Sequence, residues 1–296
     1  MDPTAIYLLF LPAALYIRAA RILHRRGYTV PPLQQACWFA GLTAIGIALL
    51  SPLDHLGETD LVSAHMGQHL LLGDIAAPLL VLGLRSPMYA FVLPRPALVP
   101  IARSKPLRRL LRFLTRPWVS APLWILILYG WHLAPSYDAA LSHPVLHALQ
   151  HQSFLVGSLL VWYSVLEPTR RRVPGELWKI AHITGVRFAG MFLGFALIVI
   201  THPIYSGFYG DRALAHGLSP YQDQQIAGGM MMGLDLIVMM ATLLFFFMRS
   251  ADDAERAQKI EDARLAQAGV LSAVPTLDGG PGRMTSGSFG GRDGRI

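Results

Sequence analysis

The chain is organised by seven long runs of hydrophobic residues, separated by polar segments. Each run holds roughly 18–25 residues, enough to cross a hydrocarbon core of ~30 Å as an α-helix. The runs lie near 4–22, 34–51, 61–84, 118–135, 144–166, 179–201 and 223–248. This pattern predicts an all-α integral membrane protein with seven transmembrane helices.

Composition and charge agree with that prediction and orient the helices. Of the 296 residues, 53% are hydrophobic and only 15% are charged, which is unusual for a soluble domain. Of the 25 Lys and Arg residues, 23 fall on one side of the predicted spans. The positive-inside rule makes that side cytoplasmic, with the N-terminus outside and the C-terminus in the cytoplasm. The net charge of +7 is explained in this way, and we expect no nucleic-acid partner.

The sequence divides into a seven-span membrane domain, residues 1–250, and a polar tail, residues 251–296, which we expect to be cytoplasmic and largely disordered. Segment 107–116 alternates leucines at helical spacing with arginines, so it predicts a short helix lying on anionic lipid. An ordinary solvated connector is the alternative. GxxxG patterns at Gly190–Gly194 and Gly229–Gly233 predict close helix packing and leave a homo-oligomer open.

Nine of the eleven histidines lie at or near the predicted outer face. At ~1.5 Å per residue, His65 and His69 reach about 6 and 12 Å below the start of their span. His147 and His151 reach almost the same depths. Each pair is spaced i, i+4, so both rings share one helix face, and two such helices could bring four imidazoles together.

The ligand types in this region indicate a soft metal ion. Trp131-His132 ends span four on the same side, methionines reach similar depths, and the only cysteine, Cys37, excludes a Cys-rich site. Imidazole with thioether sulfur suits copper, Cu(I) above all, although zinc or iron also binds imidazole. For any single histidine, hydrogen-bonded packing is the alternative. The predicted metal ligands are His65, His69, His132, His147 and His151, with Met66, Met230, Met231, Met232 and His143 as auxiliary ligands.

Three ionisable residues lie deep inside predicted spans, where charge is costly: Asp74, Arg187 and Asp235. Their similar depths predict an ion pair or triad joining spans three, six and seven. Such a network either holds the helices together or forms a polar floor beneath the histidines that orients a ligand or relays a proton.

The sequence gives no indication of an enzyme. His65-Met-Gly-Gln-His69 lacks the glutamate that follows the first histidine of a zinc protease. We also find no Ser-His-Asp order, P-loop or glycine-rich nucleotide motif.

Five motifs, in order along the chain, together resemble one family. They are His65-Met-Gly-Gln-His69, Ala77-Pro-Leu-Leu-Val-Leu-Gly83, Trp131-His132 with Tyr137-Asp-Ala-Ala-Leu141, His147-Ala-Leu-Gln-His151-Gln-Ser-Phe-Leu155, and Asp223-Gln-Gln-Ile-Ala-Gly-Gly229. Over roughly residues 5–248 the chain resembles the CtaG family, the caa3-type cytochrome c oxidase assembly factors.

The resemblance implies a multi-pass protein of the bacterial plasma (inner) membrane that is needed to build an active haem–copper oxidase. It implies copper handling, with oxidase subunits and an extracytoplasmic copper donor as partners. The family motifs correspond to His65, His69, His132, His147, His151 and Asp223. Two departures concern the ligand set and the partner oxidase: Asp74 stands where we expect an apolar residue, and Met231 or Met232 stands near an expected Trp.

Three functions follow as hypotheses. The first is a non-enzymatic metallochaperone that receives copper from outside and passes it to an oxidase metal centre. The second is a haem-binding membrane redox protein with axial histidines from two spans. The third is a copper transporter or a proton-coupled transporter that uses Asp74, Arg187 and Asp235 as the deeper part of its path.

Overall fold

The computed structural model describes residues 3–166 and 177–273, and every regular element in those ranges is helical. The elements in order are α1 (Pro3–His24), α2 (Pro32–Leu50), α3 (Pro52–Thr59), α4 (Val62–Leu70), η1 (Leu71–Ala76), α5 (Ala77–Gly83), α6 (Tyr89–Val92), α7 (Arg95–Arg103), α8 (Lys105–Leu114), α9 (Pro117–His132), α10 (Ala134–Ser142), α11 (Pro144–Leu166), α12 (Leu177–Val199), α13 (Ser206–Tyr209), η2 (Arg212–His216) and α14 (Pro220–Ala273).

Helices cover all seven hydrophobic runs of the sequence. Four of them are long and apolar enough to cross a membrane: Pro32–Leu50, Val62–Gly83, Leu177–Val199 and Pro220–Gln267. Several helices start with proline, as in α2, α9 and α11. Proline fits the first helical turn because its missing N–H has no helical partner there in any case. The all-helical class predicted from the sequence is confirmed.

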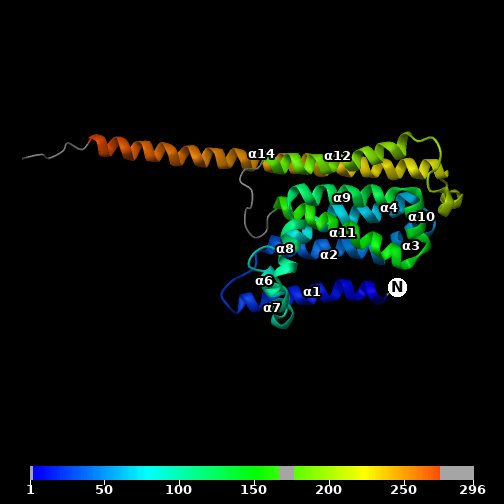
Figure 1. The fold of residues 1–296 in the computed structure, drawn as a ribbon, viewed down its shortest axis with the longest axis horizontal. Coiled ribbons are helices and arrows are strands. Elements are labelled where there is room, and N and C mark those ends of the chain that lie inside the picture. Colours follow the sequence, from blue (N-terminus) through cyan, green and yellow to red (C-terminus); the bar gives the residue numbers. More distant parts are fainter. Residues whose placement is uncertain (1–2, 167–176, 274–296) are drawn as a thin grey trace, which may run out of the picture. The chain divides into compact units, whose positions relative to one another are not determined.

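The segment α4–η1–α5 lies at the centre of the bundle, between α2 on one side and α11 on the other (Figure 1). All nine residues of α4 are buried, polar ones included. One apolar cluster joins α4 to α9, α11, α12 and α14, and a second joins η1 and α5 to α1 and α2. The histidines of α4 are therefore held at the centre of the fold rather than on its surface.

A π-helical turn, η1, interrupts this central segment and begins two residues after His69. Pro78 supplies a physical cause, because proline cannot donate to the carbonyl four residues earlier and its ring displaces that carbonyl, which belongs to Asp74. Hydrogen bonds from i to i+5 place residues five apart almost above one another. The turn thus brings Asp74 towards the helix face that carries His69.

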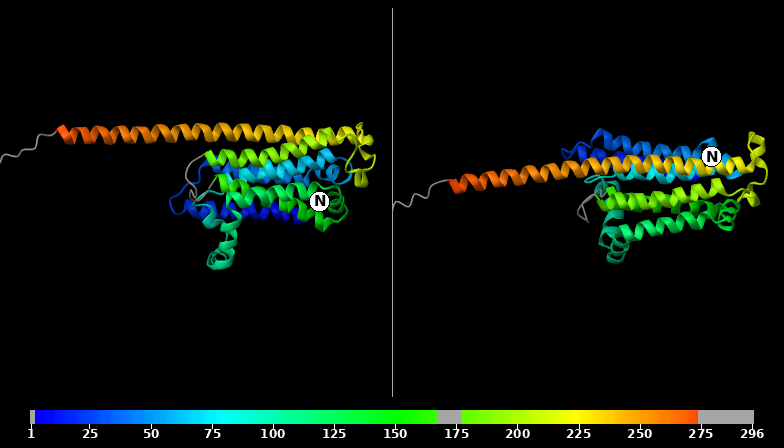
Figure 2. Two further views of the ribbon diagram at one scale, coloured as in Figure 1. Left: turned by 45° about the horizontal axis from the view of Figure 1, so that its top comes forward. Right: turned by 90° about the horizontal axis from the view of Figure 1, so that it is seen from above.

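The short helices gather at the two ends of the bundle. α3 and α10 lie at one end, and α6, α7 and α8 lie at the other (Figure 1). The α7–α8 pair projects from its end of the bundle in both views of Figure 2. α3 and α10 are therefore placed to cover the histidine-bearing ends of α4 and α11.

Glycine packing matches the sequence prediction on α12 but not on α14. A Cβ at Gly194 would lie 2.7 Å from the carbonyl oxygen of Gly228, so the two backbones are in contact there. Gly190 likewise leaves room for the carboxylate of Asp235. Gly229 and Gly233 have no neighbouring atom within 4 Å among the described residues, so the prediction is wrong for packing within the chain, where Gly228 makes the contact instead. A homo-oligomer that packs through Gly229 and Gly233 stays a prediction.

The contacts divide the chain after Ser250. From Ala251 to Ala273 the second unit is helical and carries local ion pairs, such as Lys259 with Glu255 at 2.6 Å. Of the tail expected to be largely disordered, residues 251–273 are helical, and residues 274–296 fall outside the described part of the chain.

Candidate metal-binding site

Four histidine rings from two helices meet in the bundle interior. His65 and His69 come from α4, and His147 and His151 come from α11. The ring centroid of His65 lies 4.4 Å from that of His69, 5.3 Å from that of His147 and 5.4 Å from that of His151. The i, i+4 spacing on each helix gives each pair one shared face, and the helices pack with those faces opposed.

Three of these side chains offer ligand atoms close enough to share one ion. One ring nitrogen from each of His65, His69 and His151 lies within 4.8 Å of the others, and all three residues are buried. Both nitrogens of His69, and Nε2 of His147 and His151, have no hydrogen-bond partner in the described part of the chain. Buried polar atoms normally have partners, so these unpaired nitrogens fit a bound cation.

His132, at the end of α9, forms a pair of possible ligands with the thioether of Met66. Its Nδ1 lies 2.7 Å from the carbonyl oxygen of Leu128, and since a carbonyl only accepts, Nδ1 carries the proton. Nε2 of the neutral ring then turns its lone pair towards Sδ of Met66, 3.2 Å away. Two lone-pair donors that face each other in a buried position suit a soft cation.

His147 is positioned by Glu58 of α3, which was not among the residues predicted from the sequence. Nδ1 of His147 donates to Oε1 of Glu58 over 3.0 Å, which leaves Nε2 as the free ligand atom. A carboxylate behind a ligating imidazole is a frequent arrangement at metal sites. The hydrogen bond from His147 lowers the pKa of Glu58 below its usual 4.5. The Glu58 side chain is 45% exposed, so it connects the buried histidines to the outside.

Asp223, at the start of α14, fixes the N-terminus of the histidine-bearing helix. Its carboxylate accepts hydrogen bonds from the backbone N–H of Val62 at 2.7 Å, from that of Ser63 at 3.1 Å, and from the Ser63 hydroxyl. The residue before α4, Leu61, offers no cap of its own. Asp223 therefore acts as a cap from another helix and is 1% exposed.

Tyrosines close the site on the side of α10 and α13. Tyr137 stacks on Tyr205 with centroids 4.0 Å apart and lies 5.1 Å from the ring of His65. The Tyr205 hydroxyl donates to the carbonyl of His132, and that of Tyr209 donates to the carbonyl of Gly57. These aromatic rings hold α3, α10 and α13 over the histidines.

The predicted auxiliary ligands are placed in different surroundings. Met66 and Met231 are buried and line a cavity beside His69. Met230 is 40% exposed, and Met232 packs close to Gly194. His143 is exposed at the end of α10, and no described contact joins it to the four rings. The structure thus brings two of these five side chains next to the site.

The buried charges form the triad that the sequence predicted. Nη1 of Arg187 donates to Oδ1 of Asp74 and, over 2.7 Å, to Oδ1 of Asp235. The guanidinium also lies over the ring of Trp124, with Cζ 5.1 Å from the centroid. All three charged residues are buried.

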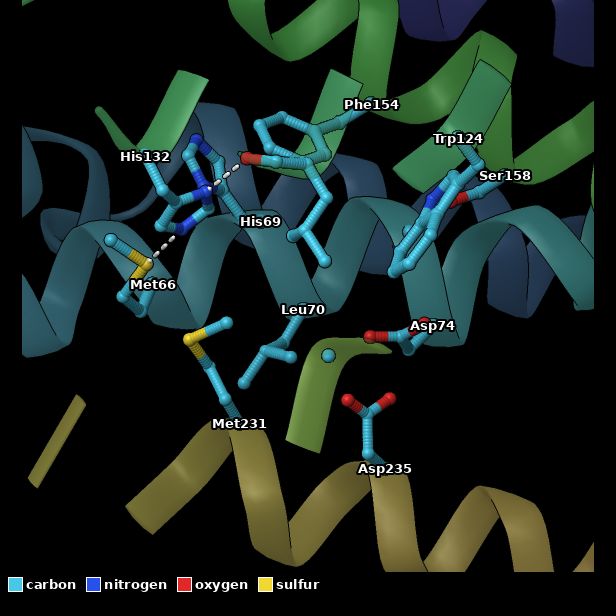
Figure 3. Close-up of a pocket in the computed structure, with 13 residues that line it drawn as sticks. Met66, His69, Leu70, Asp74, Trp124, His132, Phe154, Ser158, Met231 and Asp235 are labelled. Carbon is cyan, nitrogen blue, oxygen red and sulfur yellow. Dashed lines mark hydrogen bonds between the residues drawn. The ribbon is translucent and has the colours of Figure 1, made fainter. Parts of the chain in front are cut away.

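One cavity joins the histidines to this triad. Met66, His69, His132 and Met231 line one end, and Asp74 and Asp235 line the other. In Figure 3 the carboxylates of Asp74 and Asp235 point towards each other. The Met66–His132 contact lies at the opposite end of the cavity. The cavity has room for about one water-sized occupant.

Comparison with known families identifies the chain's relatives. The family described as cytochrome c oxidase caa3 assembly factor matches residues 14–253. The chain belongs to the caa3 cytochrome c oxidase assembly factor family. The family description names an assembly role rather than a catalysed reaction, in line with the expectation from the sequence.

Two mycobacterial relatives of this assembly factor share 26% identity over 259 residues: the uncharacterized proteins Mb0105 of Mycobacterium bovis and MT0111 of Mycobacterium tuberculosis. The alignment covers 83% of this chain but only 38% of each relative, so this chain corresponds to well under half of either protein. No solved structure matches. Family membership together with four helices able to span a bilayer fits a membrane protein.

Proposed function

We propose that this caa3 assembly factor binds copper, preferably Cu(I), among His65, His69, His147 and His151, and passes it to a metal centre of a haem–copper cytochrome c oxidase. The observation that carries the proposal is the set of buried, unpaired imidazole nitrogens on two facing helices. A buried neutral imidazole without a hydrogen-bond partner is unfavourable unless a cation takes the lone pair.

The surroundings of the rings support exchange of the metal as well as capture. Glu58 lies half-exposed behind His147, and the Met66–His132 pair lies on the other side of His69. A cation arriving from an extracytoplasmic donor meets the carboxylate and His147 first. The thioether of Met66 then offers a weaker, soft ligand from which the ion can leave for an oxidase subunit.

The alternative of a haem site receives little support. The histidine rings lie only 4.2–5.9 Å apart, and the adjoining cavity accepts about one water-sized occupant. A porphyrin plane needs a far larger slot between its two axial ligands. An absorption spectrum without a Soret band is expected for the purified protein.

We also propose that the chain crosses the bacterial plasma membrane seven times, with its N-terminus outside and its C-terminus in the cytoplasm. In that orientation the histidines lie near the outer face, where extracytoplasmic copper is available. α8 then lies on the cytoplasmic side, where its arginines and its exposed Leu110, Leu111 and Phe113 suit anionic lipid.

Metal analysis of the purified full chain tests the copper site. We expect the wild type to retain Cu(I) after loading and desalting, and His65→Ala and His147→Ala each to lower that content. His24→Ala is the matched control, because His24 is exposed at the end of α1. Equal copper retention in all four proteins, with equal oxidase assembly in cells, contradicts the proposal.

Metal flux separates a chaperone from a transporter. Reconstituted in proteoliposomes, an assembly factor that only binds and hands over copper shows no net uptake. Uptake that depends on His65 and Asp74 favours the transporter instead.

A further inference from the structure

The triad beneath the histidines contains two acidic side chains but only one basic side chain. Asp74 from η1 and Asp235 from α14 share the single guanidinium of Arg187 from α12. With all three ionised, the group carries a net charge of −1. Arg187 is 0% exposed, Asp235 is 3% and Asp74 is 7%, so water does not compensate that charge. An uncompensated charge in such a position is strongly unfavourable, so the buried group is stabilised by one further positive charge, either a proton or a cation.

The other groups around the cavity do not supply that charge. The remaining walls near the carboxylates come from Trp124 of α9 and Ser158 of α11, whose side chains do not titrate, and from Gly190 of α12. At the far end His69 and His132 are the titratable groups. The neutral ring of His132 holds its one proton on Nδ1, which donates to the Leu128 carbonyl, so this ring adds no positive charge.

The same cavity can receive a small soft cation. His69 lines it, is 6% exposed and has no hydrogen-bond partner on either ring nitrogen among the described residues. The thioethers of Met66 from α4 and Met231 from α14 also line the cavity, at the end where His69 lies (Figure 3). Nitrogen and thioether donors beside two carboxylates suit a monovalent soft ion such as Cu(I).

We propose that this cavity is an inner cation subsite in which a soft monovalent cation replaces a proton held by the Asp74–Asp235 pair. Without a cation, one of the two carboxyls is protonated and the triad is neutral. When the cation enters, that O–H bond breaks, the proton leaves for solvent, and the carboxylate balances the charge of the ion. The exchange keeps the buried charge constant. It rests on the proposed function, since it concerns the same cargo one step deeper than the four histidines.

Proton release on silver binding tests the exchange, with Ag⁺ as a redox-stable soft monovalent probe. All samples carry Cys37→Ala, because a thiol would itself release a proton to silver. At about pH 8 ordinary imidazoles, with a pKa of about 6.5, are already neutral. We expect the full chain in detergent to release close to one proton for each silver ion taken into the subsite. Asp235→Asn should bind silver at the histidines but release none, and exposed Asp211→Asn should behave like its parent.

Infrared spectroscopy of the same Cys37→Ala parent gives a second measurement that needs no aspartate variant to fold. The C=O band of a protonated carboxylic acid should be present without silver and vanish on its addition. Absence of the band, or silver binding without proton release, overturns the exchange and leaves the copper site intact. Failure of the parent to bind silver at all overturns both this inference and the proposed function.

Discussion

At the scale of single residues, Glu58 shows how an exposed carboxylate can serve buried histidines. Its hydrogen bond from His147 is strongest while Glu58 is ionised, which is why the pKa of Glu58 is lowered. A lowered pKa means that the stabilisation is complete above the ordinary value of 4.5 and is lost as the pH falls through the folded-state value. Glu58→Gln should therefore flatten the acid side of a plot of Tm against pH.

Asp138 of α10 is a useful comparison for Glu58, because the pKa of its carboxyl is shifted in the opposite direction. Burial raises the pKa of Asp138 above 3.8, so its ionisation destabilises the fold as the pH rises through that window. Asp138→Asn should remove this loss, whereas Glu58→Gln should not. Thermal unfolding of both variants in detergent across acidic pH measures the two slopes. Identical slopes in wild type and Glu58→Gln would contradict the role given to the His147 hydrogen bond.

Asp223 is expected to be a positioning residue for the metal ligands. Asp223→Ala leaves the first N–H groups of α4 without a partner in a buried place and should cost about 2 kcal/mol, near the upper end for a helix cap. Asp223→Asn keeps one acceptor oxygen and should lie between Asp223→Ala and the wild type. Copper affinity should fall in the same order, because His65 and His69 shift with the helix end. Unchanged affinity in Asp223→Ala would show that α4 is fixed by packing alone.

At the scale of helices, the close contact of α12 with α14 depends on Gly194. Gly194→Ala places a methyl group 2.7 Å from the Gly228 carbonyl oxygen, and overpacking of this kind costs about 1–3 kcal/mol. Gly233→Ala meets open space and gains up to about 1 kcal/mol of helix propensity, so it should be neutral or stabilising. Thermal unfolding compares the two alanine variants. Equal losses in both would mean that the α12–α14 contact contributes little.

The positions of the helices could be predicted from the sequence because hydropathy over about 20 residues is a local property. The two histidine pairs could also be placed, since i, i+4 spacing and depth both follow from helix geometry. The sequence could not show that Glu58 and the tyrosines around Tyr137 lie beside the histidines. Their contacts depend on how α3, α10 and α13 fold over the ends of the long helices. The π turn at Asp74 and the choice of Gly228 over Gly229 depend on small rotations of a helix, which no residue count determines.

At the scale of the whole molecule, the count and direction of the spans decide which compartment reaches the histidines. In the proposed arrangement of seven spans with the N-terminus outside, the α3–α10 end of the bundle would lie outside and the α7–α8 end in the cytoplasm. An even number of spans must then separate α7 from the residues after Ser250. One span must separate those residues from η2. Cysteine labelling can distinguish these arrangements, because the chain has a single cysteine, Cys37, to remove first.

In a Cys37→Ala background, three exposed positions serve as reporters: Ala102 at the end of α7, Ala215 in η2 and Ala254 in the second unit. A maleimide that does not cross membranes, added to intact cells, should label Ala215→Cys. It should label Ala102→Cys and Ala254→Cys only after the membrane is made permeable. The opposite pattern would reverse the orientation and move the histidines to the cytoplasmic side. Labelling of Ala102→Cys and Ala254→Cys on different sides would change the number of spans between them, and with it the bundle in which α4 and α11 face each other.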